Sequence, residues 1–197
     1  MSNSNLLSSI FAFIAMLGFQ CHANEISEDY QFKSGDVLIK KDKQWKAIKI
    51  VHIDKFENDD DTLHVLVYED SVLKPTLNVL KDTPIEIQHA PVSSEGFKKE
   101  WTVLANEKLS DRELDGFINY LKHSDFQRYA EFTNQDLNKL ITLANSKYKQ
   151  AYSLSKNSKP NEAIELYLAA VDIFPFFIEA LDNIAFIYMD FGEYEKA

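Results

Sequence analysis

Three histidines are the residues of this chain whose type and spacing best suit chemistry. His52 and His64 lie in two β-branched runs that an acidic loop separates. If this loop closes a hairpin in which Asp54 faces Thr62, then His52 faces His64 directly, about 5 Å apart at Cβ. His89, on a later run, then supplies a third imidazole, and such a set suits zinc or copper.

The alternative interpretation of these histidines is a solvated pair, because strand histidines on exposed faces are common. The spacing of His89 is not diagnostic of a metal site. We therefore predict that the chain binds no metal and no cofactor. The alternative is a metal site whose ligands are His52, His64 and His89. Residues 57–61 carry carboxylates suited to calcium, but they lack the glycine and the distant glutamate of the EF-hand loop, so we expect a solvated loop.

Known catalytic motifs are absent from the sequence. The glycines after residue 23, at positions 35, 96, 116 and 192, are never paired at the spacing of a phosphate-binding loop. No G-x-S-x-G elbow and no H-E-x-x-H pair occurs either. We therefore predict that the chain is not an enzyme. The alternative is a metal-binding or hydrolytic β domain that uses His52 and His64, with the rest of the chain as a targeting module.

The composition is that of an ordinary globular protein. The chain has 197 residues, of which 45% are hydrophobic, and its formal net charge is −10. Acidic and basic residues are mixed along it, and no Lys/Arg stripe stands out. Such a chain is poorly suited to a phosphate backbone, so we predict that it does not bind nucleic acid.

Residues 1–23 contain no charged side chain, and their apolar run from Leu6 to Phe19 covers 14 residues. A bilayer span needs about 20 residues, whereas this length suits a secretory signal peptide. We predict cleavage before Asn24 and export, to the periplasm or out of the cell. Cleavage would remove Cys21, the sole cysteine, and would leave no membrane span. The alternative is an uncleaved segment that anchors the protein in the membrane.

The fold class that the pattern predicts is α+β. Residues 24–92 are expected to form a small antiparallel β domain, as a barrel or a sheet, from runs at 37–40, 45–54, 62–70 and 85–92. Residues 93–132 are expected to form a helical connector. Within it, Ser110 and Glu113 match a capping box ahead of an amphipathic helix.

Residues 133–197 are patterned as helix, turn, helix, turn, helix. Thr133 is the expected N-cap of a long helix over 134–156, and Pro160 is expected in the first turn of the next. When the segment is compared with itself at an offset of 34, small and apolar residues coincide. The coincident pairs are Ala151 with Ala185, Leu154 with Tyr188, Ser158 with Gly192, and Ala163 with Ala197.

This period and these residues resemble the tetratricopeptide repeat (TPR) over residues 144–197. Leu181, Ile184, Ala185 and Tyr188 stand where that family has its W-x2-L-G-x2-Y signature. Ala163 and Tyr167 match its A-x3-F, and Pro175 matches its closing proline. The resemblance implies a protein-interaction scaffold that binds a protein or peptide partner.

In that family the inner helix of each hairpin lines a concave groove. By position, this implies four groove residues from the first repeat and four from the second, and they include aromatic rings beside carboxylates. These residues are Asn145, Tyr148, Tyr152, Lys156, Glu179, Asp182, Phe186 and Asp190. Such a groove suits a peptide with apolar and basic side chains. The alternative for Tyr148 and Phe186 is that they belong to the core between repeats.

The second repeat is incomplete, because the chain stops at Ala197, where its second helix would begin. The last helix is apolar nearly all round, from Ile184 to Tyr188. We therefore expect that the sequence is truncated relative to the working protein, or that a partner or a second copy covers this helix. An assembly role, with self-association through residues 178–191, is the corresponding alternative.

Overall fold

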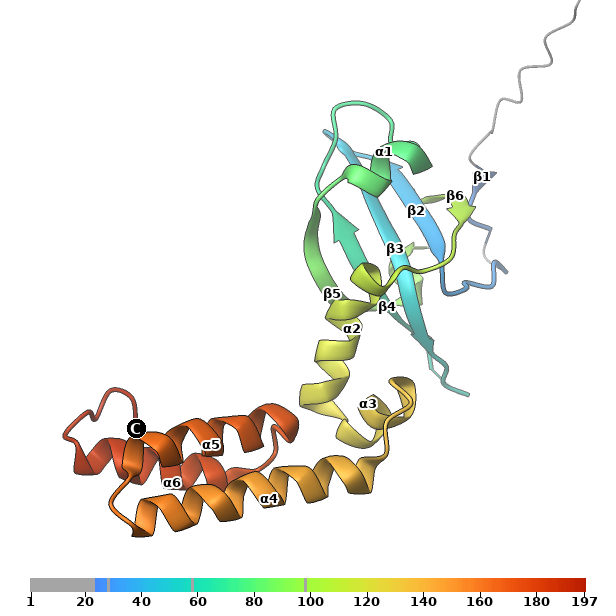
Figure 1. The fold of residues 1–197 in the computed structure, drawn as a ribbon. Coiled ribbons are helices and arrows are strands. Elements are labelled where there is room, and N and C mark those ends of the chain that lie inside the picture. Colours follow the sequence, from blue (N-terminus) through green and yellow to red (C-terminus); the bar gives the residue numbers. More distant parts are fainter. Residues whose placement is uncertain (1–23, 28, 58, 98) are drawn as a thin grey trace, which may run out of the picture.

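The structure is a computed structural model that describes residues 24–27, 29–57, 59–97 and 99–197. It consists of an antiparallel sheet followed by helices, so the α+β class is confirmed (Figure 1). The signal peptide that we predict over 1–23 lies outside the described residues.

The sheet has six strands in the order β1-β6-β2-β3-β4-β5, and every neighbouring pair is antiparallel. Among the described residues, β1 and β5 are its two edges, so it is an open sheet and not a closed barrel. The strands are β1 (Asn24–Glu25), β2 (Asp36–Lys41), β3 (Trp45–Asp54), β4 (Thr62–Tyr68), β5 (Ile85–Ser93) and β6 (Thr102–Asn106).

The predicted boundary between the β domain, 24–92, and the helical connector, 93–132, is wrong. Strand β6 lies inside the expected connector and pairs with β2, more than 60 positions earlier, so the sheet extends to Asn106. The periodicity of residues 102–106 does not reveal this pairing, because it does not show which distant strand has a free edge for them. The short helix α1 (Leu77–Asp82), which Thr76 caps, is a second element that the pattern missed.

Both faces of the sheet are covered. On one face α1 and α2 (Asp111–Ser124) bury apolar side chains such as Val51, Leu66 and Phe117. The other face is closed by the segment around Ile26 and by the 3-10 turn η1 (Ser94–Phe97). Burial on both faces explains why the middle of β3 is continuously apolar or buried instead of alternating.

The helices begin and end close to the expected residues. The capping box of Ser110 and Glu113 starts α2, and Pro160 is the first residue of α5 (Pro160–Ile173). One cap is wrong: α4 (Leu137–Lys156) is capped by Asp136. Thr133 instead ends α3 (Phe126–Phe132), and its hydroxyl donates to the carbonyl of Tyr129.

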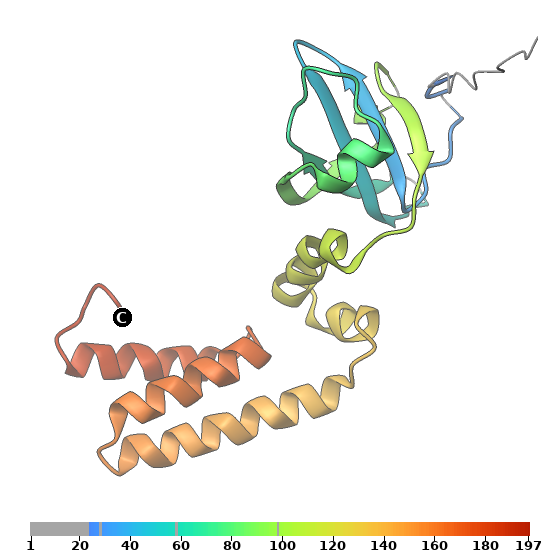
Figure 2. The same cartoon turned by 45° about the horizontal axis from the view of Figure 1, so that its top comes forward.

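The last three helices form a group apart from the sheet, which follows α2 and α3, and in it α5 returns along α4 and α6 (Ile178–Asp190) lies along α5 (Figure 2). Alanines that are fully buried between the helices let them approach closely, and Tyr167 fills the centre of their core. This group meets the preceding helices through the rings of Phe126 and Phe174, whose centroids are 5.0 Å apart. No helix in the described part of the chain has both the length and the apolarity to span a bilayer.

Candidate functional site

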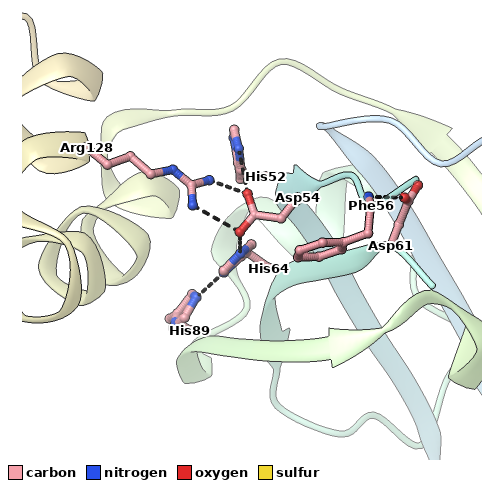
Figure 3. A network of polar contacts seen from close by, with 7 residues as sticks. All are labelled: His52, Asp54, Phe56, Asp61, His64, His89 and Arg128. Carbon is pink, nitrogen blue, oxygen red and sulfur yellow. Dashed lines mark hydrogen bonds and ion pairs between the residues drawn. The ribbon is translucent and has the colours of Figure 1, made fainter. Parts of the chain in front are cut away.

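The predicted pairing of the two histidines is confirmed. Strands β3 and β4 place Asp54 opposite Thr62 and His52 opposite His64. The loop between the strands is held by Asp61, whose side chain accepts a hydrogen bond of 3.4 Å from the backbone N–H of Phe56 (Figure 3). The count of residues across the loop therefore suffices to predict which residues face each other.

A β-bulge between Ile50 and His52 determines which face of the sheet the histidine occupies. Side chains alternate along a strand, so without an extra residue His52 would share the face of Ile50. The bulge inserts Val51 and turns His52 to the face of His64, beneath α2. There the ring of His52 stacks on Phe117, with 4.9 Å between centroids and 15° between planes.

Asp54 is the centre of the polar cluster (Figure 3). Its Oδ2 accepts hydrogen bonds of 2.9 Å from Nε2 of His64 and 3.0 Å from the guanidinium of Arg128, and its Oδ1 accepts a second bond from Arg128. Nε2 of His52 lies 3.4 Å from Oδ1. One carboxylate thus holds two strands of the sheet and helix α3 together.

His64 also joins His89 of β5, with 2.8 Å between its Nδ1 and Nε2 of His89. Because Asp54 accepts at Nε2 of His64, that nitrogen carries a hydrogen. In neutral His64 the other nitrogen, Nδ1, is an acceptor, so His89 donates to it. The result is a hydrogen-bonded series of carboxylate, imidazole and imidazole, in which the ionised carboxylate sets the tautomer of His64.

Helix α2 covers this series with aromatic rings. Tyr120 stacks on His89 at 4.4 Å, and Phe117 contacts His64 at 4.8 Å, both measured between ring centroids. The helix comes this close because Gly116 lies against β5: a Cβ there would stand 2.2 Å from the carbonyl oxygen of Gln88. Glycine at this position therefore allows the aromatic rings of α2 to lie directly against the histidines.

The charges of the cluster shift the pKa values of its members. Burial opposes ionisation of Asp54, but the hydrogen bonds from Arg128 and His64 outweigh it and lower the pKa to about 2. Burial, and then the positive charge that His64 has when it is protonated, lowers the pKa of His89 to about 4. Burial, followed by the charge of Arg128, lowers the pKa of His52. At neutral pH the site is thus an ionised carboxylate, a cationic Arg128, and at least two neutral imidazoles, His52 and His89.

His64 is buried, so the solvated pair is wrong. The three histidines lie close together, but His64 bonds to His89 and His52 lies against Asp54, so they do not converge on a common point. Both ring nitrogens of His64 are engaged in hydrogen bonds. Within the described ranges, no group of three histidine, cysteine, aspartate or glutamate side chains has an arrangement that could hold a metal ion. The geometry favours structural coupling of the strands over metal ligation.

No protein-family model matches this chain, and no curated protein and no solved structure matches it either. The candidate sites therefore rest on the chain's own geometry.

The second candidate site is the surface of the last helices. On α4 the predicted groove residues Asn145, Tyr148, Tyr152 and Lys156 follow one another at intervals of three or four, so they share a face. Tyr148 meets α6, because the side-chain amide of Asn183 donates to its hydroxyl at 3.3 Å. The rings of Tyr148 and Tyr152 stack at 6.4 Å, and Lys156 lies over Tyr152.

On α6 the predicted groove residues Glu179, Asp182, Phe186 and Asp190 are all exposed. Phe186 is 63% exposed, so the alternative in which it belongs to the core is wrong. Tyr148, in contrast, is half-buried and packs against the helical core. The eight residues thus divide into one that supports the helices and seven that face solvent.

Sequence reasoning did not identify Asp54, Arg128 and Tyr120 as site residues. The sequence does contain a signal for Asp54: it follows His52 by two positions at the end of a strand, so the two side chains share a face. The sequence contains no such signal for Arg128, because 74 positions separate it from Asp54 and no feature of its helix distinguishes it as a site residue.

Proposed function

We propose that this protein is an interaction scaffold, in which α4, α5 and α6 form a TPR-like helical array that binds a peptide or protein partner. The observation that carries the proposal is the outer surface of α6. Its large apolar side chains Ile178, Leu181, Phe186 and Met189 are each more than 40% exposed. Apolar side chains gathered in this way on one element mark interaction surfaces.

The charges on α6 indicate the chemistry of the partner. The helix contains Glu179, Asp182 and Asp190 and no lysine or arginine. Between the apolar side chains it therefore presents only negative charge. A partner that carries aliphatic or aromatic residues beside lysine or arginine is complementary to it.

The packing of the helices supports the array geometry. Ala151 of α4 and Ala163 and Ala170 of α5 are fully buried in the helical core, as closely packed hairpins require. On the other side of the array Tyr148 contacts both Asn183 and the ring of Phe177, at 4.9 Å between centroids. These contacts support the proposed register between the first and second repeat.

Selection of a random peptide library on the full chain tests the proposal. We expect selected peptides to combine apolar and basic side chains, and we expect Phe186→Asp and Asp182→Lys each to weaken their binding about tenfold. Lys149→Glu, on exposed surface of α4, is the control and should bind as well as the parent chain. Selection of acidic peptides, or equal binding of the selected peptides by all variants, would contradict the proposal.

Self-association is the second candidate, since the same exposed side chains on residues 178–191 suit a second copy. Sedimentation velocity over a wide range of concentration separates the two. A monomer at all concentrations favours the scaffold. A concentration-dependent dimer that Phe186→Asp abolishes favours self-association.

A further inference from the structure

A cavity of about 410 Å³ opens on the sheet face that α1 and α2 cover, between α1 and the loop that enters α2. The apolar part of its lining comes from β2, β4, β5 and α1. The apolar lining residues are Val37, Tyr68, Leu77, Leu80 and Ile85. This volume is within the range of pockets that hold small ligands.

One wall contains a buried ion pair that is already satisfied. Lys49 is only 4% exposed, and its Nζ donates to both carboxylate oxygens of Glu113, at 2.9 and 3.0 Å, and to the carbonyl of Lys108. The hydroxyl of Tyr68 donates to the same carboxylate at 3.0 Å. These charges compensate each other, so they contribute shape and rigidity to the cavity and no excess charge.

The mouth of the cavity is positively charged. Lys81, Lys108 and Arg112 are exposed at its rim, and none of them forms an ion pair with any residue that the structure describes. The rim has one carboxylate outside the buried pair, that of Glu107. In a chain with a net charge of −10, three cations against one carboxylate at an apolar cavity are a local exception.

We propose that this cavity binds a small amphipathic anion, such as a carboxylate with an aliphatic or aromatic body. The body lies on the apolar floor beside Leu77 and Leu80. The carboxylate lies at the rim, where Arg112 offers paired N–H donors and Lys81 and Lys108 add positive charge. A neutral ligand would gain nothing from the rim, and a cation would be repelled by it.

Calorimetric titration of the full chain with decanoate and with decanol tests the chemistry. We expect saturable binding of one decanoate per chain, and binding of decanol that is about tenfold weaker, because only decanoate has the charge. Equal affinities, or no saturable binding of decanoate, would overturn the proposal. Vesicles of anionic lipid form the second arm, because a bilayer presents the same chemistry. Binding to vesicles without binding to decanoate would also overturn it.

Variants locate the binding. We expect Lys108→Glu combined with Arg112→Glu to weaken decanoate binding about tenfold, and Leu77→Trp to block it by filling the cavity. Lys149→Glu changes charge on α4, away from the cavity, and should have no effect. Phe186→Ser removes the single phenylalanine of α6, an exposed one, and should have none either. If Phe186→Ser weakens binding and the cavity variants do not, the anion binds elsewhere and the inference is wrong. Thermal melting of each variant confirms that it is folded.

Discussion

The guanidinium of Arg128 donates two hydrogen bonds to the carboxylate of Asp54, and this contact joins α3 to the end of β3. The same carboxylate holds His64, which in turn holds His89. Three strands and a helix therefore depend on one aspartate. The strength of this cluster can be measured by removing its members singly.

Arg128→Ala should lower the free energy of unfolding by about 1–3 kcal/mol, because it leaves a partly buried carboxylate with two bonds fewer. Arg128→Lys should recover only part of the loss, since an ammonium cannot make the paired contact. Urea denaturation measures both. Lys122→Ala is the matched control: its partner Asp172 is 84% exposed, so less than about 1 kcal/mol is expected. An equal loss in both alanine variants would contradict the structural importance of Asp54.

The pH dependence of stability should reflect protonation of the imidazoles of the cluster. The pKa of His89 is lowered from 6.5 to about 4, and that of His52 is also lowered. Between these pH values the unfolded chain binds more protons than the folded one, so stability falls as the pH falls from about 6.5 to 4. The lowered pKa of Asp54 acts in the same direction, but only below about pH 5, so it overlaps just the acidic end of this window.

Denaturation at a series of pH values checks this slope. His89→Gln should reduce it between pH 6.5 and 4, because only His52 of the two imidazoles with a lowered pKa then remains. His123→Gln, which changes an exposed histidine of α2, should leave the slope as it is. A slope that is unchanged in His89→Gln would show that another group is responsible.

Gly116→Ala should be destabilising even though alanine is the better helix former. The gain in helix propensity is about 1 kcal/mol, but the new Cβ would meet the carbonyl of Gln88 at 2.2 Å and push α2 from β5. We expect a net loss of about 1–3 kcal/mol and a change in the NMR signals of His89 and Tyr120. Gly96→Ala is the control, since its nearest neighbour would lie at 3.8 Å.

Zinc should not bind stoichiometrically, because ligation would require His64 to give up one of its two hydrogen bonds. Elemental analysis of the chain after incubation with zinc and gel filtration tests this expectation. One zinc per chain, lost when His52 and His64 are both replaced by alanine, would instead support the metal-binding alternative.

Tyr167→Phe should leave stability unchanged or raise it by about 1 kcal/mol. The hydroxyl of Tyr167 is buried in the helical core and has no hydrogen-bond partner among the described residues. An unpaired buried hydroxyl costs free energy, which the phenylalanine avoids. Tyr148→Phe should behave differently, because it removes the acceptor of Asn183. Thermal melting of the two variants distinguishes these cases.

Local patterns in the sequence were enough for most of the helices and strands. The capping box at Ser110, the proline at 160 and the apolar runs of β3 and β4 each depend on neighbours within a few residues. Sequence patterns at this range are informative because capping and strand alternation are themselves local interactions. The missed strand β6 depends instead on an edge that β2 leaves free.

The sequence by itself determined that His52 would face His64, because the length of one loop sets the register of one hairpin. Only the tertiary structure decided what these residues do there. The bulge at Val51 places His52 on the same face of the sheet as His64. The glycine at 116 allows α2 to bring its aromatic rings against these histidines. Arg128 came from a helix 74 positions away to hold Asp54. Contacts of this kind follow from the packing of whole elements, which no short stretch of residues encodes.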